Sequence, residues 1–160
     1  CGVSYTEEGF PHTWFPFLSS KVVGIRVMDI CKNDINRGLY QLAHEIIHCL
    51  CPHREINANV FEEGLATHFA AEYMDEYEKQ PDWHPAETDY KYVLALKCIK
   101  KAFEIDPNIA TKLVAKERNF VNITENMILE VSPKLPRDLA KILTTDFYDD
   151  SWIELANKIE

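Results

Sequence analysis

The chain has 160 residues, of which 46% are hydrophobic and 27% charged, a composition typical of a globular protein that buries its own core. Its formal net charge is −9 at pH 7, which argues against a nucleic-acid partner, because such a partner needs a basic patch. No segment approaches the run of about 18 apolar residues that spans a membrane. We therefore predict a single domain over residues 1–160, without a membrane span.

The five cysteines are an odd number and lack the spacing of a disulfide framework, which predicts reduced thiols. Reduced thiols favour a cytoplasmic protein. Because the chain begins at Cys1 and not at Met, a secreted form and a lipoprotein body trimmed at its acylated cysteine are the alternatives.

The first segments predict a small sheet before residue 35. Residues 1–20 combine prolines with many aromatic side chains, so we expect this arm to pack irregularly on the body of the protein. Lys21–Ile30 is rich in β-branched residues and is the best predicted strand in the chain.

A helix follows the strand. Lys32-Asn33-Asp34 predicts a turn, Asp34 or Asn36 is expected to cap the helix, and Pro52 is expected to end it just after Cys51. Five apolar residues of this helix predict a buried stripe: Leu39, Leu42, Ala43, Ile46 and Leu50.

The same helix carries the motif H-E-x-x-H at His44, Glu45 and His48. Two histidines four residues apart on a helix lie one turn above each other, so both imidazoles can bind one ion. Glu45 leaves the helix about 100° further round, beside that face. The pattern is typical of zinc hydrolases, in which the carboxylate accepts a proton from a water that the metal acidifies. We therefore predict a Zn²⁺ site with Glu45 as general base.

The third ligand of a catalytic zinc has to come from elsewhere, and a second helix predicted from about Ala58 to Glu78 offers two candidates. Glu62 and Glu63 point about 100° apart, so only one of them can face the ion. The residue pattern alone does not choose between them.

The H-E-x-x-H motif followed by E-G-L-A at Glu63–Ala66 resembles the gluzincin branch of the zincin metallopeptidases, over about forty residues from Leu39 to Tyr77. The resemblance implies a zincin-like fold in which His44, His48 and Glu63 bind Zn²⁺ and peptide bonds are hydrolysed. In zincins a strand before the active-site helix pairs with extended substrate through its edge. That role, or mere support of the core, is expected of Val22–Met28.

A second resemblance is the runner-up. Glu55–Phe61 is similar to the E-x-x-A-N-x-F helix of small metallopeptidases that cleave bacterial repressors, which would make Glu55 the third ligand.

The remainder of the chain predicts a helical C-terminal half. After a loop at Gln80–Pro85, helices are expected over about Glu87–Ile105, Asn108–Glu117, Thr124–Val131, Leu135–Thr145 and Ser151–Ile159. The overall prediction is a mainly helical α+β fold, with a small N-terminal sheet beside the H-E-x-x-H helix.

Hydrolysis also needs a donor for the oxyanion of the tetrahedral intermediate. Gluzincins often supply a Tyr or His from downstream of the glutamate helix, and the resemblance points to Tyr90 first, then to Tyr92 and His84. His68 lies about 140° round the helix from Glu63 and is not expected to be a ligand. Thr67, one turn after Glu63, is a candidate for a supporting hydrogen bond.

Cys49 and Cys51 could suggest a structural zinc knuckle. The C-x-C spacing lacks the usual reach, so buried thiols are the favoured interpretation.

The sequence therefore predicts a zinc-dependent metallopeptidase that acts on a peptide or protein substrate. The alternative is a non-catalytic or regulatory zinc-binding module. The intact Glu45 argues against that alternative, because a site without turnover does not need its general base.

Overall fold

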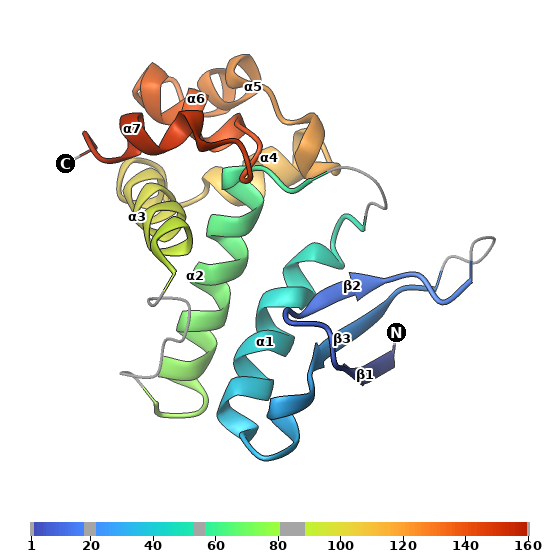
Figure 1. Ribbon diagram of the computed structural model, residues 1–160. Coiled ribbons are helices and arrows are strands. Elements are labelled where there is room, and N and C mark those ends of the chain that lie inside the picture. The colour runs from blue at the N-terminus through green and yellow to red at the C-terminus, as the bar shows by residue number, and fades with distance from the viewer. Residues whose placement is uncertain (1, 18–21, 53–56, 81–88, 160) are drawn as a thin grey trace. The chain divides into compact units, whose positions relative to one another are not determined.

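The computed structural model describes residues 2–17, 22–52, 57–80 and 89–159, which are mainly helical with one small sheet (Figure 1). This confirms the predicted mainly helical α+β class. The chain forms two compact units, one of Cys1–Glu55 with Phe69–Pro85 and the other of Ile56–His68 with Ala86–Glu160. The α2 helix (Val60–Glu76) contributes to both units, its first half to the second unit and its second half to the first.

The sheet of the first unit has the strand order β1-β3-β2, and all three strands precede residue 35, as predicted. β1 (Gly2–Thr6) pairs in parallel with β3 (Gly24–Met28), and β2 (His12–Trp14) pairs with β3 in the antiparallel direction. The expectation of an irregular arm over residues 1–20 was wrong for β1 and β2. Both segments are short, and a short strand is stable only when it pairs with another; β3 supplies the backbone partners for both.

The central position of β3 also corrects the expected substrate-pairing role of Val22–Met28. Both edges of β3 are occupied by neighbouring strands, so its backbone groups are not available to extended substrate. The interpretation of this segment as core support fits the structure. Ile25 and Val27 are 2% and 4% exposed and form a buried cluster with Cys31, against which Leu42 packs.

A 3₁₀ turn, η1 (Asp29–Lys32), leads from β3 into α1 (Ile35–His48). Asp34 caps α1 as predicted, because its carboxylate accepts a hydrogen bond from the backbone N–H of Arg37 at 3.0 Å. Gln41 ties the helix to the strand that precedes it. Its Oε1 accepts hydrogen bonds from the N–H of Met28 at 2.9 Å and from the thiol of Cys31 at 3.2 Å.

The predicted apolar stripe of α1 was wrong in its outer members, since Ile46 and Leu50 are 42% and 61% exposed. The buried face includes the polar motif, and its residues are Tyr40, Gln41, Ala43, His44, Glu45 and Ile47. A prediction from apolar periodicity assumes that a helix buries its most hydrophobic face. Here His44 and Glu45 are on the buried side, which is expected of a helix whose polar residues are functional.

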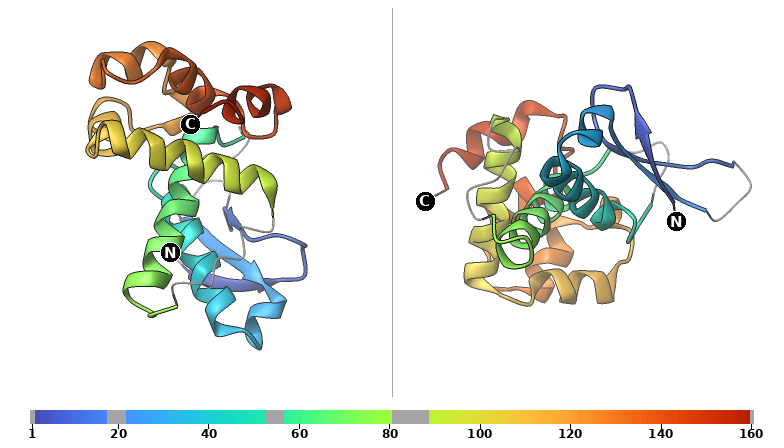
Figure 2. Two further views of the ribbon diagram at one scale, coloured as in Figure 1. Left: turned by 90° about the vertical axis from the view of Figure 1, so that its left-hand side faces the viewer. Right: turned by 90° about the horizontal axis from the view of Figure 1, so that it is seen from below.

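The second unit is built from the first half of α2 and a set of C-terminal helices. They are α3 (Tyr90–Ile105), α4 (Ile109–Lys116), η3 (Phe120–Asn122), α5 (Glu125–Val131), α6 (Arg137–Thr144), η4 (Asp150–Trp152) and α7 (Ile153–Ala156). The α6 helix packs against both α3 and α5 (Figure 2). Predicted helix ends agree within three residues, except that Ser151–Ile159 divides into η4 and α7.

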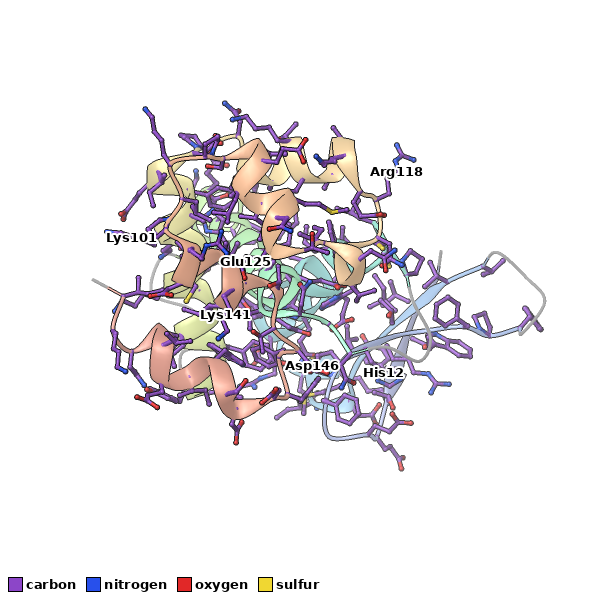
Figure 3. All side chains as sticks on the ribbon, turned by 90° about the horizontal axis from the view of Figure 1, so that it is seen from above. His12, Lys101, Arg118, Glu125, Lys141 and Asp146 are labelled. Carbon is purple, nitrogen blue, oxygen red and sulfur yellow. The ribbon has the colours of Figure 1, made fainter. Side chains whose placement is uncertain are left out.

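The core of this unit is apolar and fully enclosed. The side chains of Ile99, Leu113, Phe120, Ile128 and Ile142 are all 0% exposed. Charged residues such as Lys101, Glu125 and Lys141 lie outside it (Figure 3). Among the described helices, none is both long and apolar enough to cross a membrane.

Candidate metal centre

The two histidines of the H-E-x-x-H motif lie side by side on α1. The centroids of the His44 and His48 rings are 5.2 Å apart, with 54° between the ring planes. His44 is 8% exposed and His48 is partly exposed. The helical spacing therefore places two imidazoles on one face, as the sequence predicts.

Glu63 on α2 completes a group of three. His44, His48 and Glu63 each offer one ligand atom, and these atoms all lie within 4.8 Å of one another. Glu63 is 5% exposed. No second group of three or more such side chains was found in the described parts of the chain. The group could hold a metal ion, and it is formed with Glu63 and not with Glu62.

The chemistry and size of the group fit a metal ion. Two imidazole nitrogens and one carboxylate oxygen are a common set of ligands for first-row transition metals. Ligand atoms around a tetrahedral zinc are about 3.4 Å apart, given bonds of about 2.0–2.1 Å. A group with separations of at most 4.8 Å needs a contraction of at most about 1.4 Å in its widest pair, which side-chain torsions can supply.

Two further carboxylates are buried near the group in sequence. Glu45 is 4% exposed on α1, and Glu62 is 0% exposed on α2. Neither belongs to the metal-binding group. An ionised carboxylate is costly to bury, so these positions are candidates for functional residues.

The glutamate helix is held close to α3. A Cβ at Gly64 would lie 2.7 Å from the carbonyl oxygen of Ala95 and 2.7 Å from Cγ1 of Ile99, so the two helices touch at a residue without a side chain. Thr67, 1% exposed, donates a hydrogen bond from Oγ1 to the backbone carbonyl of Glu63 at 2.8 Å. The expected support by Thr67 therefore acts on the backbone of Glu63.

One residue that the sequence reasoning missed is Asn59, which precedes α2. Its side-chain oxygen accepts a hydrogen bond from the N–H of Glu62 at 2.9 Å. The signal was present, because Asn followed three residues later by Glu is a pattern that starts helices.

The candidate oxyanion donors have other contacts. Tyr90 is 54% exposed, and its hydroxyl donates a hydrogen bond to Oδ1 of Asn157 at 2.5 Å. The ring of Tyr92 lies 4.9 Å from that of Phe147. His84 lies outside the described residues. A catalytic role for Tyr90 thus stays a prediction, and it requires release of the bond to Asn157.

The other candidate metal ligands considered from the sequence are Glu55, His68, Cys49 and Cys51. Glu55, the ligand of the runner-up family, lies outside the described residues. His68 is not in the metal-binding group, and its ring lies 5.0 Å from that of Phe103. Cys49 and Cys51 are free thiols that are partly buried, and neither belongs to the group.

Comparisons with protein-family models, with curated proteins and with solved structures found no match for this chain. The interpretation of the site therefore depends on its own chemistry.

Proposed function

We propose that this chain is a zinc-dependent metallopeptidase. The observation that carries the proposal is the convergence of His44, His48 and Glu63, whose ligand atoms lie within 4.8 Å of one another. The resemblance of H-E-x-x-H and E-G-L-A to gluzincins supplies the reaction class, and the buried Glu45 supplies a base.

Zinc is the favoured ion for this set of ligands. Imidazole selects against Mg²⁺ and Ca²⁺, which prefer all-oxygen sites, and two His with one Glu is a ligand set of catalytic zinc that leaves a fourth position open. A bound Zn²⁺ would supply a Lewis acid that polarises a carbonyl and lowers the pKa of water. His48 is only partly buried, which suits a site that substrate has to reach.

Glu45 would carry the proton transfers. It follows His44 directly in the helix, so its carboxylate leaves the backbone about 100° round from the ligand face. In the proposed reaction it accepts a proton from the attacking water as the new C–O bond forms. It then gives that proton to the amine as the C–N bond breaks. The general base is regenerated, and no other proton donor is needed.

The proposed partner is a peptide or protein chain. Among the described strands, β1 and β2 form the edges of the sheet, and β3 does not. Any pairing of extended substrate with the sheet therefore has to use one of these outer strands.

Metal analysis tests the first half of the proposal. The parent is expected to bind about one Zn²⁺ per chain, and His44→Ala and His48→Ala are expected to lose nearly all of it. His12→Ala is the matched control, because His12 lies on β2 and does not belong to the metal-binding group. Full zinc in both site variants would end the assignment.

Peptide cleavage tests the second half. The zinc-loaded parent is incubated with a mixed peptide pool, and the products are identified by mass spectrometry. A chelator is expected to stop the cleavage and added zinc to restore it. A parent that binds zinc but never cleaves any peptide would favour the non-catalytic module.

A further inference from the structure

Asn59 accepts hydrogen bonds from the backbone N–H groups of Glu62 and Glu63, the two neighbouring glutamates on α2. The side-chain Oδ1 of Asn59 accepts from the N–H of Glu62 at 2.9 Å, and its backbone carbonyl accepts from the N–H of Glu63 at 3.1 Å. The first N–H groups of a helix have no partner within it, so a cap at this position fixes the first turn. Glu63 lies in that turn.

The other end of the Asn59 amide reaches a distant segment. Its Nδ2 donates to the backbone carbonyl of Phe120 in η3 at 2.8 Å, across 61 positions of sequence. Asn59 is 4% exposed, and Phe120 is 0% exposed. The phenyl rings of Phe61 and Phe120 also meet edge to face at 5.8 Å. The amide therefore bridges the start of α2 to the core of the same unit.

The residue type follows from this double role. Asp is also a good helix cap, but its ionised carboxylate has no donor for the carbonyl of Phe120. Ser and Thr carry donor and acceptor on one hydroxyl oxygen, whereas Asn offers them on two separate atoms, Oδ1 to Glu62 and Nδ2 to Phe120. The two partners also fix the orientation of the amide, since an N–H requires the oxygen and a carbonyl requires the nitrogen.

A short antiparallel bridge surrounds Asn59. The N–H of Val60 donates to the carbonyl of Thr145 at 2.9 Å, and the N–H of Phe147 donates to the carbonyl of Ala58 at 3.0 Å. Asn57 donates to the carboxylate of Asp146 at 2.9 Å. The backbone before Glu63 is thus held from both sides within one unit.

We infer that Asn59 is a positioning residue for the metal centre: its amide bridge to Phe120 and Glu62 fixes the turn of α2 that presents Glu63. This inference rests on the metal-binding part of the proposed function and does not depend on turnover. Residues that hold metal ligands in place typically account for about 10- to 100-fold in metal affinity.

The experiment measures metal affinity in Asn59→Ala, in Asn59→Asp and in the parent. Zn²⁺ is titrated against a chromophoric chelator, and Co²⁺ is titrated by its visible absorption, which reports the coordination geometry. Asn59→Ala is expected to weaken binding of both ions by about 10- to 100-fold and to alter the Co²⁺ spectrum. An Ala variant with the affinity and spectrum of the parent would overturn the inference.

Asn59→Asp removes the bridge to Phe120 but retains the helix cap. Because it retains the cap, it keeps the inference testable if Asn59→Ala does not fold. It retains an oxygen for the N–H of Glu62 but presents an acceptor to the carbonyl of Phe120. An added carboxylate by itself favours a cation, so a weaker affinity in this variant runs against the direct effect of the charge and points to loss of the bridge. Affinity at or above that of the parent would overturn the inference.

Thr124→Ala is the matched control. Thr124 caps α5 in the same unit through a hydrogen bond from the N–H of Met127 at 3.3 Å, and it belongs to no metal-binding group. This variant is expected to lower the thermal midpoint and to leave metal affinity and the Co²⁺ spectrum unchanged. Equal losses of affinity in both Ala variants would reduce Asn59 to a purely structural residue. A parent that binds neither ion would refute the site and the inference together, whereas a parent that binds zinc without cleaving peptides would refute only the peptidase.

Discussion

Gly64 on α2 lies directly against Ala95 on α3: a Cβ at Gly64 would come within 2.7 Å of the Ala95 carbonyl oxygen. The contact gives the glycine of the E-G-L-A segment a physical reason, because it lets α3 approach the turn that carries Glu63. Gly elsewhere inside a helix costs about 1 kcal/mol relative to Ala. At this position, however, the absent side chain is what allows the two helices to pack.

Gly64→Ala is therefore expected to destabilise the protein. Overpacking a tight contact typically costs about 1–3 kcal/mol, which exceeds the gain of about 1 kcal/mol in helix propensity. Chemical denaturation of the metal-free protein measures the change. Gly38→Ala in α1 is the control, since its Cβ would meet a side-chain atom, Cβ of Cys31, at the looser distance of 3.3 Å. A Gly64→Ala variant as stable as the parent would contradict this account of the contact.

Glu63→Ala is expected to weaken zinc binding far more than Glu62→Ala. Only Glu63 belongs to the group with His44 and His48, and adjacent helical residues point about 100° apart. Both side chains are at least nine-tenths buried, so a general loss of stability cannot distinguish them. Zinc affinity measured on the folded variants distinguishes the two side chains. If Glu62→Ala weakened zinc binding more than Glu63→Ala, Glu62 would be the ligand, and the proposed placement among the gluzincins would be wrong.

The sequence predicted those features of the fold and site that depend on local spacing. His44 and His48 share a face because they are four residues apart, and Asp34 caps α1 with its own side chain. Features that depend on distant partners were missed. β1 and β2 become strands only by pairing with β3, and the donor function of Asn59 requires the carbonyl of Phe120, 61 positions away.

The choice between Glu62 and Glu63 belongs to a third kind of feature. Helical periodicity says that only one of them faces the ion, but not which one, because the rotation of α2 about its axis is set by packing. The Cβ-free contact of Gly64 with α3 is one determinant of that rotation, and no local pattern encodes it.

The acid stability of the second unit is expected to depend on Asp106. A hydrogen bond from Lys112 lowers the pKa of the Asp106 carboxyl below its usual value, and a further hydrogen bond from the N–H of Asn108 acts in the same direction. Because the folded pKa lies below the unfolded value of about 3.9, the stabilisation is complete above that value. It is lost as the pH falls through the folded pKa.

Thermal midpoints measured from pH 7 down to about pH 2, through the range below the unfolded pKa, test this expectation. Asp106→Asn should lower the midpoint at neutral pH and flatten its decline toward acid. Glu154→Gln is the control, because the pKa of Glu154 is also lowered by a hydrogen bond, from Lys158, but the pair is largely exposed and contributes little. Parallel profiles for the parent and Asp106→Asn would show that the Asp106 bond does not stabilise the fold.

The central claim is that Glu45 is the base of a zinc peptidase, and Glu45→Gln tests it most directly. The substitution is nearly isosteric and removes the basicity of the carboxylate while the three proposed ligands remain. Zinc content, thermal midpoint and peptide cleavage are measured on one preparation of the variant and of the parent. The account predicts unchanged zinc and fold with cleavage reduced at least about 10²- to 10⁴-fold, the usual contribution of a general acid–base group. A zinc-loaded Glu45→Gln variant that cleaves at close to the parental rate would contradict it.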